Sequence, residues 1–324
     1  MPHELVAVSR AFLQSCLSLG YPHCSDFNSG DEGVGLLPFN IGADGTRYGS
    51  AIVFLTEAVR RRPNLHITDK ATVSKILFDG NRAIGVRYRR DGLEQMHHAD
   101  KIILCAGPIR SPHLLLLSGI GPGEDLRKLH LPVVADSPGV GRSLQDHPCI
   151  NLYWDLQDGA TTELDHTGIQ VALRYGTSSG LPLTAAQINC TQFAFGMTED
   201  DIFHLDKRKV GMACHLYRIL SKGSVTLDPR CVEDPPMVDY CYLSSAQDLN
   251  AMKIIVKEAF RIAATGPIAG MLAAPLHGSN CVEDLDSTTL SDGIRFGEWL
   301  RRNAVTGQHT SSSCRMGPHP ILSL

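Results

Sequence analysis

Residues 101–121 constrain the fold of this chain more than any other stretch. Their sequence, KIILCAGPIRSPHLLLLSGIG, joins two apolar runs through a glycine. The first run, Lys101–Ala106, is predicted to be a strand buried on both faces, because such strands are continuously apolar. Gly107 ends it, and Ser111 is suited to cap a helix that begins at Pro112. A strand, a glycine turn and a capped helix predict part of a nucleotide-binding α/β layer.

Apolar periodicity predicts further elements on both sides of this stretch. Helical spacing predicts helices over Glu4–Leu19, Gly49–Arg61 and Gln247–Ala264. From Leu65 to Arg89 the period changes to two around turn residues, which predicts a small antiparallel meander. Strand-like segments follow at Ile150–Trp154, Gln187–Phe193, Val210–Tyr217 and Ser224–Leu227.

Composition excludes several classes of protein. The 324 residues are 43% hydrophobic and 20% charged, which is ordinary for a globular protein with a substantial core. The formal net charge of -4 leaves no basic excess for neutralising phosphates, so nucleic-acid binding is not expected. Glu4 and Arg10 interrupt the apolar part of the N-terminus, which argues against a signal peptide. No apolar run is long enough to span a bilayer.

The ten cysteines contain no CxxC pair, so they predict neither a zinc site nor a redox pair of the thioredoxin type. We expect reduced and mostly buried thiols, with Cys105 as a small apolar residue inside the predicted strand. Reduced thiols are typical of a cytoplasmic protein, although an even number of cysteines also permits disulfides. The histidines lack metal-ligand spacing, and no metal is implied.

Seven sequence motifs follow one another along the chain. They are DGTRYGSA (44–51), RRPNLHI (61–67), ATVSKILFDGNRAIGVRY (71–88), GPIRSPHLLLLSGIG (107–121), PGVGRSLQDHP (138–148), SKGSVTLDPR (221–230) and HTSSSCRMG (309–317). Together they resemble the glucose-methanol-choline (GMC) family of FAD-dependent oxidoreductases. The resemblance extends over nearly the whole chain.

This resemblance implies roles for particular residues. It places His309 beside the flavin, where its imidazole accepts the hydroxyl proton of an alcohol while hydride passes to flavin N5. An imidazole suits this task because it titrates near neutrality. His147 is implied to support the structure near the flavin. The candidate cofactor-binding residues are Val73, Ala106, Gly107, Ser111, Asp146 and His147.

Two of these candidates have a specific implied contact with the cofactor. The segment around Val73 would present backbone groups to the adenine of FAD. At the Ala106–Gly107 turn, the absence of a Cβ would let the cofactor approach the main chain closely. Outside these motifs, Val73 and Gly107 would be taken for a core valine and a turn glycine.

A dinucleotide site also needs a glycine-rich turn between a buried strand and a helix. Gly33–Gly35, Gly119–Gly121 and Gly139–Gly141 each lack the third glycine, and none follows a buried strand and opens a helix. In GMC relatives that turn lies N-terminal to all the residues present here. The family's chain also continues past CRMG to a second histidine or an asparagine. We therefore expect a chain truncated at both ends.

The predicted fold class is α/β, or α+β overall. It combines an incomplete FAD-binding Rossmann-like domain with a substrate domain built on a mostly antiparallel sheet with flanking helices. We expect an N-terminal helix and loop on the substrate domain (1–48), the partial FAD-binding domain (49–148), the substrate-binding domain (149–302), and a return to the FAD-binding domain with the histidine motif (303–324).

The leading functional hypothesis is an FAD-dependent oxidoreductase that acts on the CH–OH group of a small-molecule alcohol. It would be of the choline or alcohol dehydrogenase or oxidase type, with oxygen or another compound as electron acceptor. One alternative is a catalytically silent remnant or binding module without FAD. Another is a non-redox lyase on the same scaffold. The alcohol, the acceptor and the oligomeric state leave no signal in the sequence.

Overall fold

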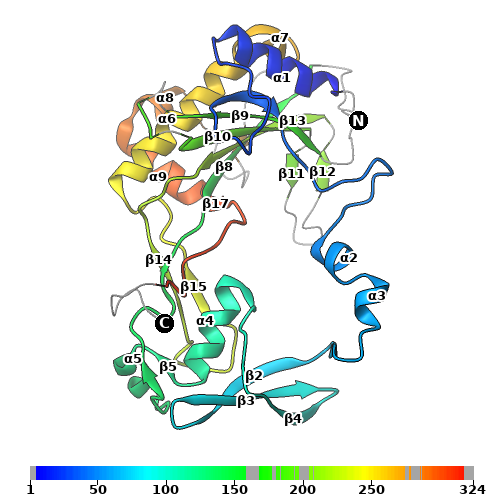
Figure 1. The fold of residues 1–324 in the computed structure, drawn as a ribbon. Helices are drawn as coiled ribbons and strands as arrows, with labels where there is room; N and C mark the ends of the chain where they lie inside the picture. Colours follow the sequence, from blue (N-terminus) through cyan, green and yellow to red (C-terminus); the bar gives the residue numbers. More distant parts are fainter. Residues whose placement is uncertain are drawn as a thin grey trace. The chain divides into compact units, whose positions relative to one another are not determined.

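The computed structural model describes residues 5–157, 168–176, 180–182, 184–192, 194–196, 204–206, 208–273, 277–278, 285 and 287–316 (Figure 1). The fold is mixed α/β, with antiparallel sheets and packed helices. The chain divides into two compact units, and each is assembled from three stretches of sequence. Unit 1 comprises Met1–Thr56, His147–Leu220 and Leu243–Gly307, and unit 2 comprises Glu57–Asp146, Ser221–Tyr242 and Gln308–Leu324.

Unit 1 is built on one antiparallel sheet of seven strands. Its order is β1 (Gly33–Leu36), β9 (Ile169–Tyr175), β10 (Ala186–Thr191), β13 (Lys209–Leu216), β8 (Pro148–Asp155) and β16 (His277–Gly278), with β17 (Val305–Thr306) also paired to β8. A separate pair joins β11 (Ala194–Gly196) to β12 (His204–Asp206). The strands predicted near Ile150, Gln187 and Val210 are confirmed as parts of β8, β10 and β13.

Alternation along these strands separates an apolar face from a polar face. On the apolar face, Leu173, Ile188 and Cys214 are fully buried, and α1 (Ala7–Ser18) and α6 (Ala246–Ala263) pack over the sheet (Figure 1). The polar face carries a row of directly opposed residues from four adjacent strands. They are Arg174, Gln187, His215 and Cys149.

Hydrogen bonds between amide side chains run beside this row. Gln187 Nε2 donates to Asn189 Oδ1 at 2.8 Å, and Asn189 Nδ2 lies 3.3 Å from His215 Nε2. An amide nitrogen can only donate, so this contact requires an unprotonated Nε2 on His215. The same nitrogen of the buried His215 ring also lies 3.7 Å from the Cys149 thiol, so Nε2 has contacts from two strands.

The predicted terminal and long helices are confirmed, while the predicted helix over 49–61 is wrong in its extent. That stretch forms two short helices, α2 (Ser50–Phe54) and α3 (Glu57–Arg60). Neither buries a residue, and Phe54 is 71% exposed. Helical spacing alone gives little stability, because most of the stability of a protein helix comes from packing a buried face. Without a buried face, this stretch does not form one continuous helix. The remaining helices of unit 1 are α7 (Gly266–Ala269), α8 (Ser287–Ser291) and α9 (Gly293–Asn303).

Unit 2 contains an antiparallel meander of β2 (Thr72–Asp79), β3 (Arg82–Arg90) and β4 (Leu93–His98). β2 and β3 confirm two of the predicted strands, whereas Leu65–Ile67 forms no strand and the third strand is β4. It packs on α4 (Gly107–Leu117), where the Ile76 amide donates to Ser118 Oγ at 2.9 Å. A second antiparallel sheet joins β7 (Arg142–Leu144), β14 (Gly223–Thr226) and β15 (Met237–Asp239). The parallel pair β5 (Ile120–Gly121) and β6 (Ala135–Asp136) flanks α5 (Gly123–Lys128).

The predicted buried strand over Lys101–Ala106 is wrong. The segment has no strand structure, Ile103 is 84% exposed, and Cys105 is also exposed. A strand needs neighbours that bond its backbone groups. Among the described residues no strand pairs with this segment, so its apolar composition alone does not make it one.

The helix after this segment begins earlier than predicted. α4 starts at Gly107, whose φ is +77°, and Ser111 and Pro112 lie inside it. Because Pro112 has no N–H, the Pro108 carbonyl lacks its usual partner one turn later. The Ser313 hydroxyl donates to that carbonyl instead. A residue 205 positions away in sequence therefore supplies the hydrogen bond that Pro112 cannot donate to this helix start.

No described helix is both long and apolar enough to cross a membrane.

Candidate active site

The segment that carries His309 is bonded to the rest of unit 2 through a buried carboxylate. Asp146 is 3% exposed, and its Oδ1 accepts the backbone N–H of His309 at 2.8 Å. Its Oδ2 accepts the Tyr242 hydroxyl at 2.6 Å. Hydrogen bonds to an ionised acceptor are stronger than those between neutral groups. Asp146 thus joins two distant segments of the chain at one point.

A pair of tyrosines supports this contact from β14–β15. Tyr240 and Tyr242 follow β15 and stack with ring centroids 4.9 Å apart at 2°. The Tyr240 hydroxyl lies 3.2 Å from Oγ1 of Thr310, the residue after His309. The two stacked rings therefore contact both partners of this site, Tyr242 through Asp146 and Tyr240 through Thr310.

Backbone pairing continues along the same segment. Gln145 and Ser311 exchange two backbone hydrogen bonds of 3.1 and 2.8 Å, and the Gly141 amide donates to the Ser313 carbonyl at 2.8 Å. With the Ser313 bond to Pro108, these contacts tie the segment to the 138–148 block and to the start of α4.

The backbone around His309 is strained at two positions. Gln308 has φ of +61° and Ser312 has φ of +69°, and neither is glycine. Each such conformation costs on the order of 1 kcal/mol and persists only where surrounding contacts hold it. Here the contacts to Asp146, Gln145 and Gly141 hold it. His309 itself is exposed on this anchored turn.

The structure brings some of the predicted site residues together and leaves others apart. Asp146 and the His309 segment are brought together, and Gly107 and Ser111 lie on α4, which Ser313 contacts through Pro108. Val73 lies in β2 opposite Tyr88 and is 39% exposed, and Ala106 is exposed at the start of α4.

His147 belongs to unit 1 and contacts residues of that unit. Its ring lies 4.6 Å from the ring of Tyr217, and its carbonyl accepts the Gly307 amide at 2.9 Å. Burial raises the pKa of Tyr217 to about 12, so its phenol is neutral at ordinary pH. His147 has a packing role in this unit.

Tyr240 and Tyr242 were not among the site residues predicted from the sequence. The strand period of two carries no signal for this pair, because β15 ends at Asp239 and Cys241, between the two tyrosines, has a left-handed φ of +48°. Nothing local indicated that this face would meet Asp146, which lies 96 residues away from Tyr242 in the sequence.

The glycine pairs noted in the sequence do not form a dinucleotide turn. Gly33 and Gly35 lie in β1, which is antiparallel to β9. Gly119 and Gly121 follow α4, and Gly141 precedes β7. In the part of the chain that the structure describes, no glycine-rich turn leads from a buried strand into a helix.

The surface is nevertheless open at two predicted cofactor contacts. A Cβ added to Gly107 would meet no atom within 4 Å, and Ala106 beside it is exposed. The Val73 side chain is also partly exposed. These positions fit a part of FAD that contacts main chain.

Comparison with known proteins identifies similar chains. The GMC oxidoreductase family models match residues 2–149 and 220–323. A GMC-type oxidoreductase from the thcA 5′ region of Rhodococcus erythropolis is 31% identical over 97% of this chain and 58% of its own length. The mitochondrial choline dehydrogenase of Mus musculus is 31% identical over 95% of this chain and 54% of its own length.

Solved structures have the same fold. Pyridoxine 4-oxidase from Mesorbium loti aligns with a TM-score of 0.85 at 25% identity, over 98% of this chain and 61% of that one. A fungal aryl-alcohol oxidase aligns with a TM-score of 0.77 at 17% identity, over 96% of this chain and 62% of that one. The chain thus spans a little over half the length of the relatives it matches.

Proposed function

The chain belongs to the GMC oxidoreductase family, and from this premise we propose that it takes part in FAD-dependent oxidation of a small-molecule alcohol. Choline and pyridoxine, which appear in the names of two similar proteins, are both alcohols. We propose the same substrate class here. Oxygen or another compound serves as electron acceptor.

The observation that carries this proposal is the anchored turn at His309. A general base must be held within hydrogen-bond reach of the proton that it removes. Asp146 fixes the main chain at His309, and the contacts of Ser311 and Ser313 fix the residues after it. The imidazole therefore stands on a fixed backbone while remaining exposed to a ligand.

We assign the residues of unit 2 to the cofactor. Val73, Ala106 and Gly107 lie at open surface where we expect FAD to contact the main chain, and Asp146 supports the turn that carries the base. FAD, when bound, supplies the acceptor for hydride. The imidazole of His309 takes the hydroxyl proton of the alcohol. Unit 1 is proposed as the substrate-binding part.

Two measurements test this proposal. The purified chain is titrated with FAD by visible absorbance, and choline and a panel of primary alcohols are then added without oxygen. A protein-bound flavin spectrum that bleaches with an alcohol is the expected result. Bound flavin without bleaching would contradict the oxidation. Absence of bound flavin at high FAD would favour a binding module that lacks the cofactor.

His309→Ala tests the base in the same assay. We expect flavin reduction to slow by roughly a hundredfold or more, as on loss of a general base. His97→Ala, on the exposed strand β4, is the matched control and should leave the rate unchanged. Reduction at the wild-type rate in His309→Ala would remove this residue from the mechanism.

A further inference from the structure

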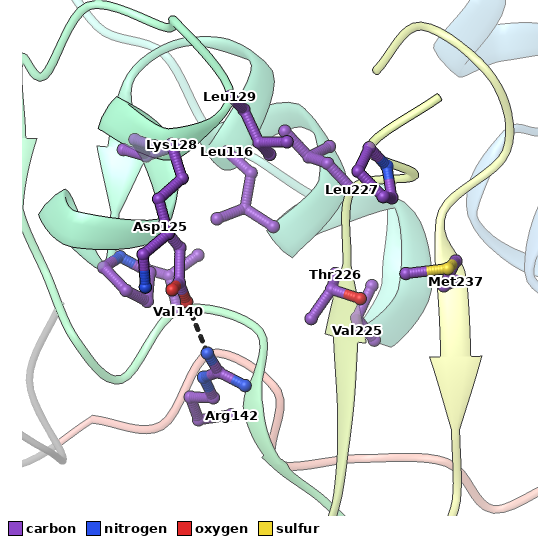
Figure 2. A pocket seen from close by; sticks show the side chains of 13 residues that line it. Leu116, Asp125, Lys128, Leu129, Val140, Arg142, Val225, Thr226, Leu227 and Met237 are labelled. Atoms are coloured by element: carbon purple, nitrogen blue, oxygen red, sulfur yellow. Dashed lines mark hydrogen bonds and ion pairs between the residues drawn. The ribbon is translucent and has the colours of Figure 1, made fainter. Parts of the chain in front are cut away.

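A pocket of about 390 Å³ lies in unit 2, among α4, α5, β14 and β15 (Figure 2). This volume falls in the range of small-molecule sites. None of the residues that line it belongs to the 308–316 segment, and neither Asp146 nor Tyr242 lines it. The pocket is therefore separate from the residues assigned to alcohol oxidation.

Its walls are made of core side chains. Leu116, Leu126, Val140, Val225 and Leu227 line it, and each is at most 5% exposed. Most of them belong to the hydrophobic cluster that holds α4 and α5 together. Close-packed core side chains have little freedom to collapse into the space, so the pocket is a preformed feature of the unit.

Charges at its edge are already neutralised in pairs. Arg142 Nη2 lies 2.5 Å from Asp125 Oδ2, the contact marked by a dashed line in Figure 2. Lys128 Nζ lies 2.7 Å from Glu124 Oε1. Each cation at the edge therefore already shares its charge with a carboxylate, and moving a charged ligand from water into the apolar remainder of the pocket costs free energy.

One lining residue offers a neutral hydrogen-bonding group. Thr226 carries the only hydroxyl among the lining side chains, and this hydroxyl has no protein partner among the residues that the structure describes. A ligand with a single neutral polar group could therefore use it at no cost to the fold.

We propose that this pocket binds a small uncharged apolar molecule with at most one hydrogen-bonding group. A dry cavity of about 150 Å³ is enough to hold benzene. The larger volume here suits a bicyclic ring system or a chain of comparable size. This site does not depend on FAD or on the proposed oxidation.

Fluorescence titration with N-phenyl-1-naphthylamine tests the proposal, since this neutral probe brightens in apolar surroundings. We expect saturable binding at one site per chain. 1-Anilinonaphthalene-8-sulfonate has nearly the same ring system with an added sulfonate, and we expect it to bind at least about tenfold more weakly. Equal or tighter binding of the sulfonate would overturn the assignment to an uncharged ligand.

Variants on β15 locate the probe. Met237 lines the pocket and is 45% exposed, so Met237→Trp should fill the pocket without unfolding the chain. Val238, the next residue, is 36% exposed and does not line it, because successive residues of a strand face opposite ways. Val238→Trp is therefore the matched control.

We expect Met237→Trp to weaken the affinity for the neutral probe at least about tenfold. The affinity of Val238→Trp should stay within about twofold of the wild-type value. Met237→Ala, which opens the pocket, should retain binding. Circular dichroism establishes that each variant is folded. If the probe does not saturate, or binds folded Met237→Trp as it binds the wild-type chain, the pocket does not bind this class of ligand.

Discussion

At the scale of single residues, Asp146 is the most consequential side chain of the candidate site. It is buried, it accepts the backbone N–H of His309, and it accepts the Tyr242 hydroxyl. Sequence resemblance assigned it to the cofactor, whereas the structure gives it direct contacts with the catalytic candidate's own backbone. Asp146 is therefore a positioning residue for His309.

Asp146→Ala should lower the free energy of unfolding by about 3 kcal/mol, because each hydrogen bond to a charged group contributes about 1.5–3 kcal/mol. Asp146→Asn keeps one acceptor oxygen and should lower the free energy of unfolding by less. Urea unfolding measures the change. Asp100→Ala is the control, since the Asp100 side chain is 98% exposed and its ion pair with Arg82 contributes little. Equal losses in Asp146→Ala and Asp100→Ala would refute the anchoring role.

At the scale of elements, the start of α4 depends on a residue outside the helix. Pro112 removes the N–H that would bond the Pro108 carbonyl, and the Ser313 hydroxyl replaces it. The serine is 2% exposed and belongs to the histidine segment. One hydrogen bond thus couples the order of the helix start to the order of that segment.

Ser313→Ala should destabilise the chain by about 1 kcal/mol, the net contribution of a typical hydrogen bond. Amide hydrogen exchange should also become faster in the first turn of α4 than in its last turn. Ser311→Ala is the control, because the exposed Ser311 hydroxyl contacts only the Ser312 hydroxyl among the residues that the structure describes. Unchanged exchange in Ser313→Ala would show that the helix start does not need this bond.

At the scale of the whole molecule, buried thiols and phenols make stability depend on alkaline pH. Burial raises the pKa of Cys190 from 9.0 to about 12 and that of Tyr217 from 10.0 to about 12. Burial likewise raises the pKa of Cys16 and Cys214. In the unfolded chain these groups ionise at their ordinary values, whereas the folded chain keeps them protonated.

The folded-state pKa values are raised, so the stability linked to these groups is fully present below about pH 9 and is lost as pH rises toward 12. We expect urea midpoints, measured with reductant, to fall between pH 8 and pH 10.5. The free energy of unfolding derived from these curves falls with pH in the same range. In Cys190→Ala its slope should be shallower by at most about 1.4 kcal/mol per pH unit.

Cys231→Ala is the matched control, because Cys231 is exposed and its removal should leave the decline unchanged. A wild-type midpoint that stays constant over this range would contradict the linkage.

The sequence by itself determined the family and most of the local structure. The meander, the antiparallel strands of unit 1 and the long helix α6 follow from periodicities of 2 and 3.6, which are properties of neighbouring residues. The ordered motifs determined the family. These features can be predicted without knowing which distant segments of the chain lie next to one another.

Only the tertiary structure decided the rest. Lys101–Ala106 has strand composition but no described partner strand, and in α4 the distant Ser313 hydroxyl bonds the Pro108 carbonyl that Pro112 leaves without an N–H partner. Asp146 meets His309 across 163 residues of sequence. The physical reason is the same in each case. A local pattern specifies what a segment can form, while hydrogen bonds from residues far along the chain decide whether it forms and what it holds.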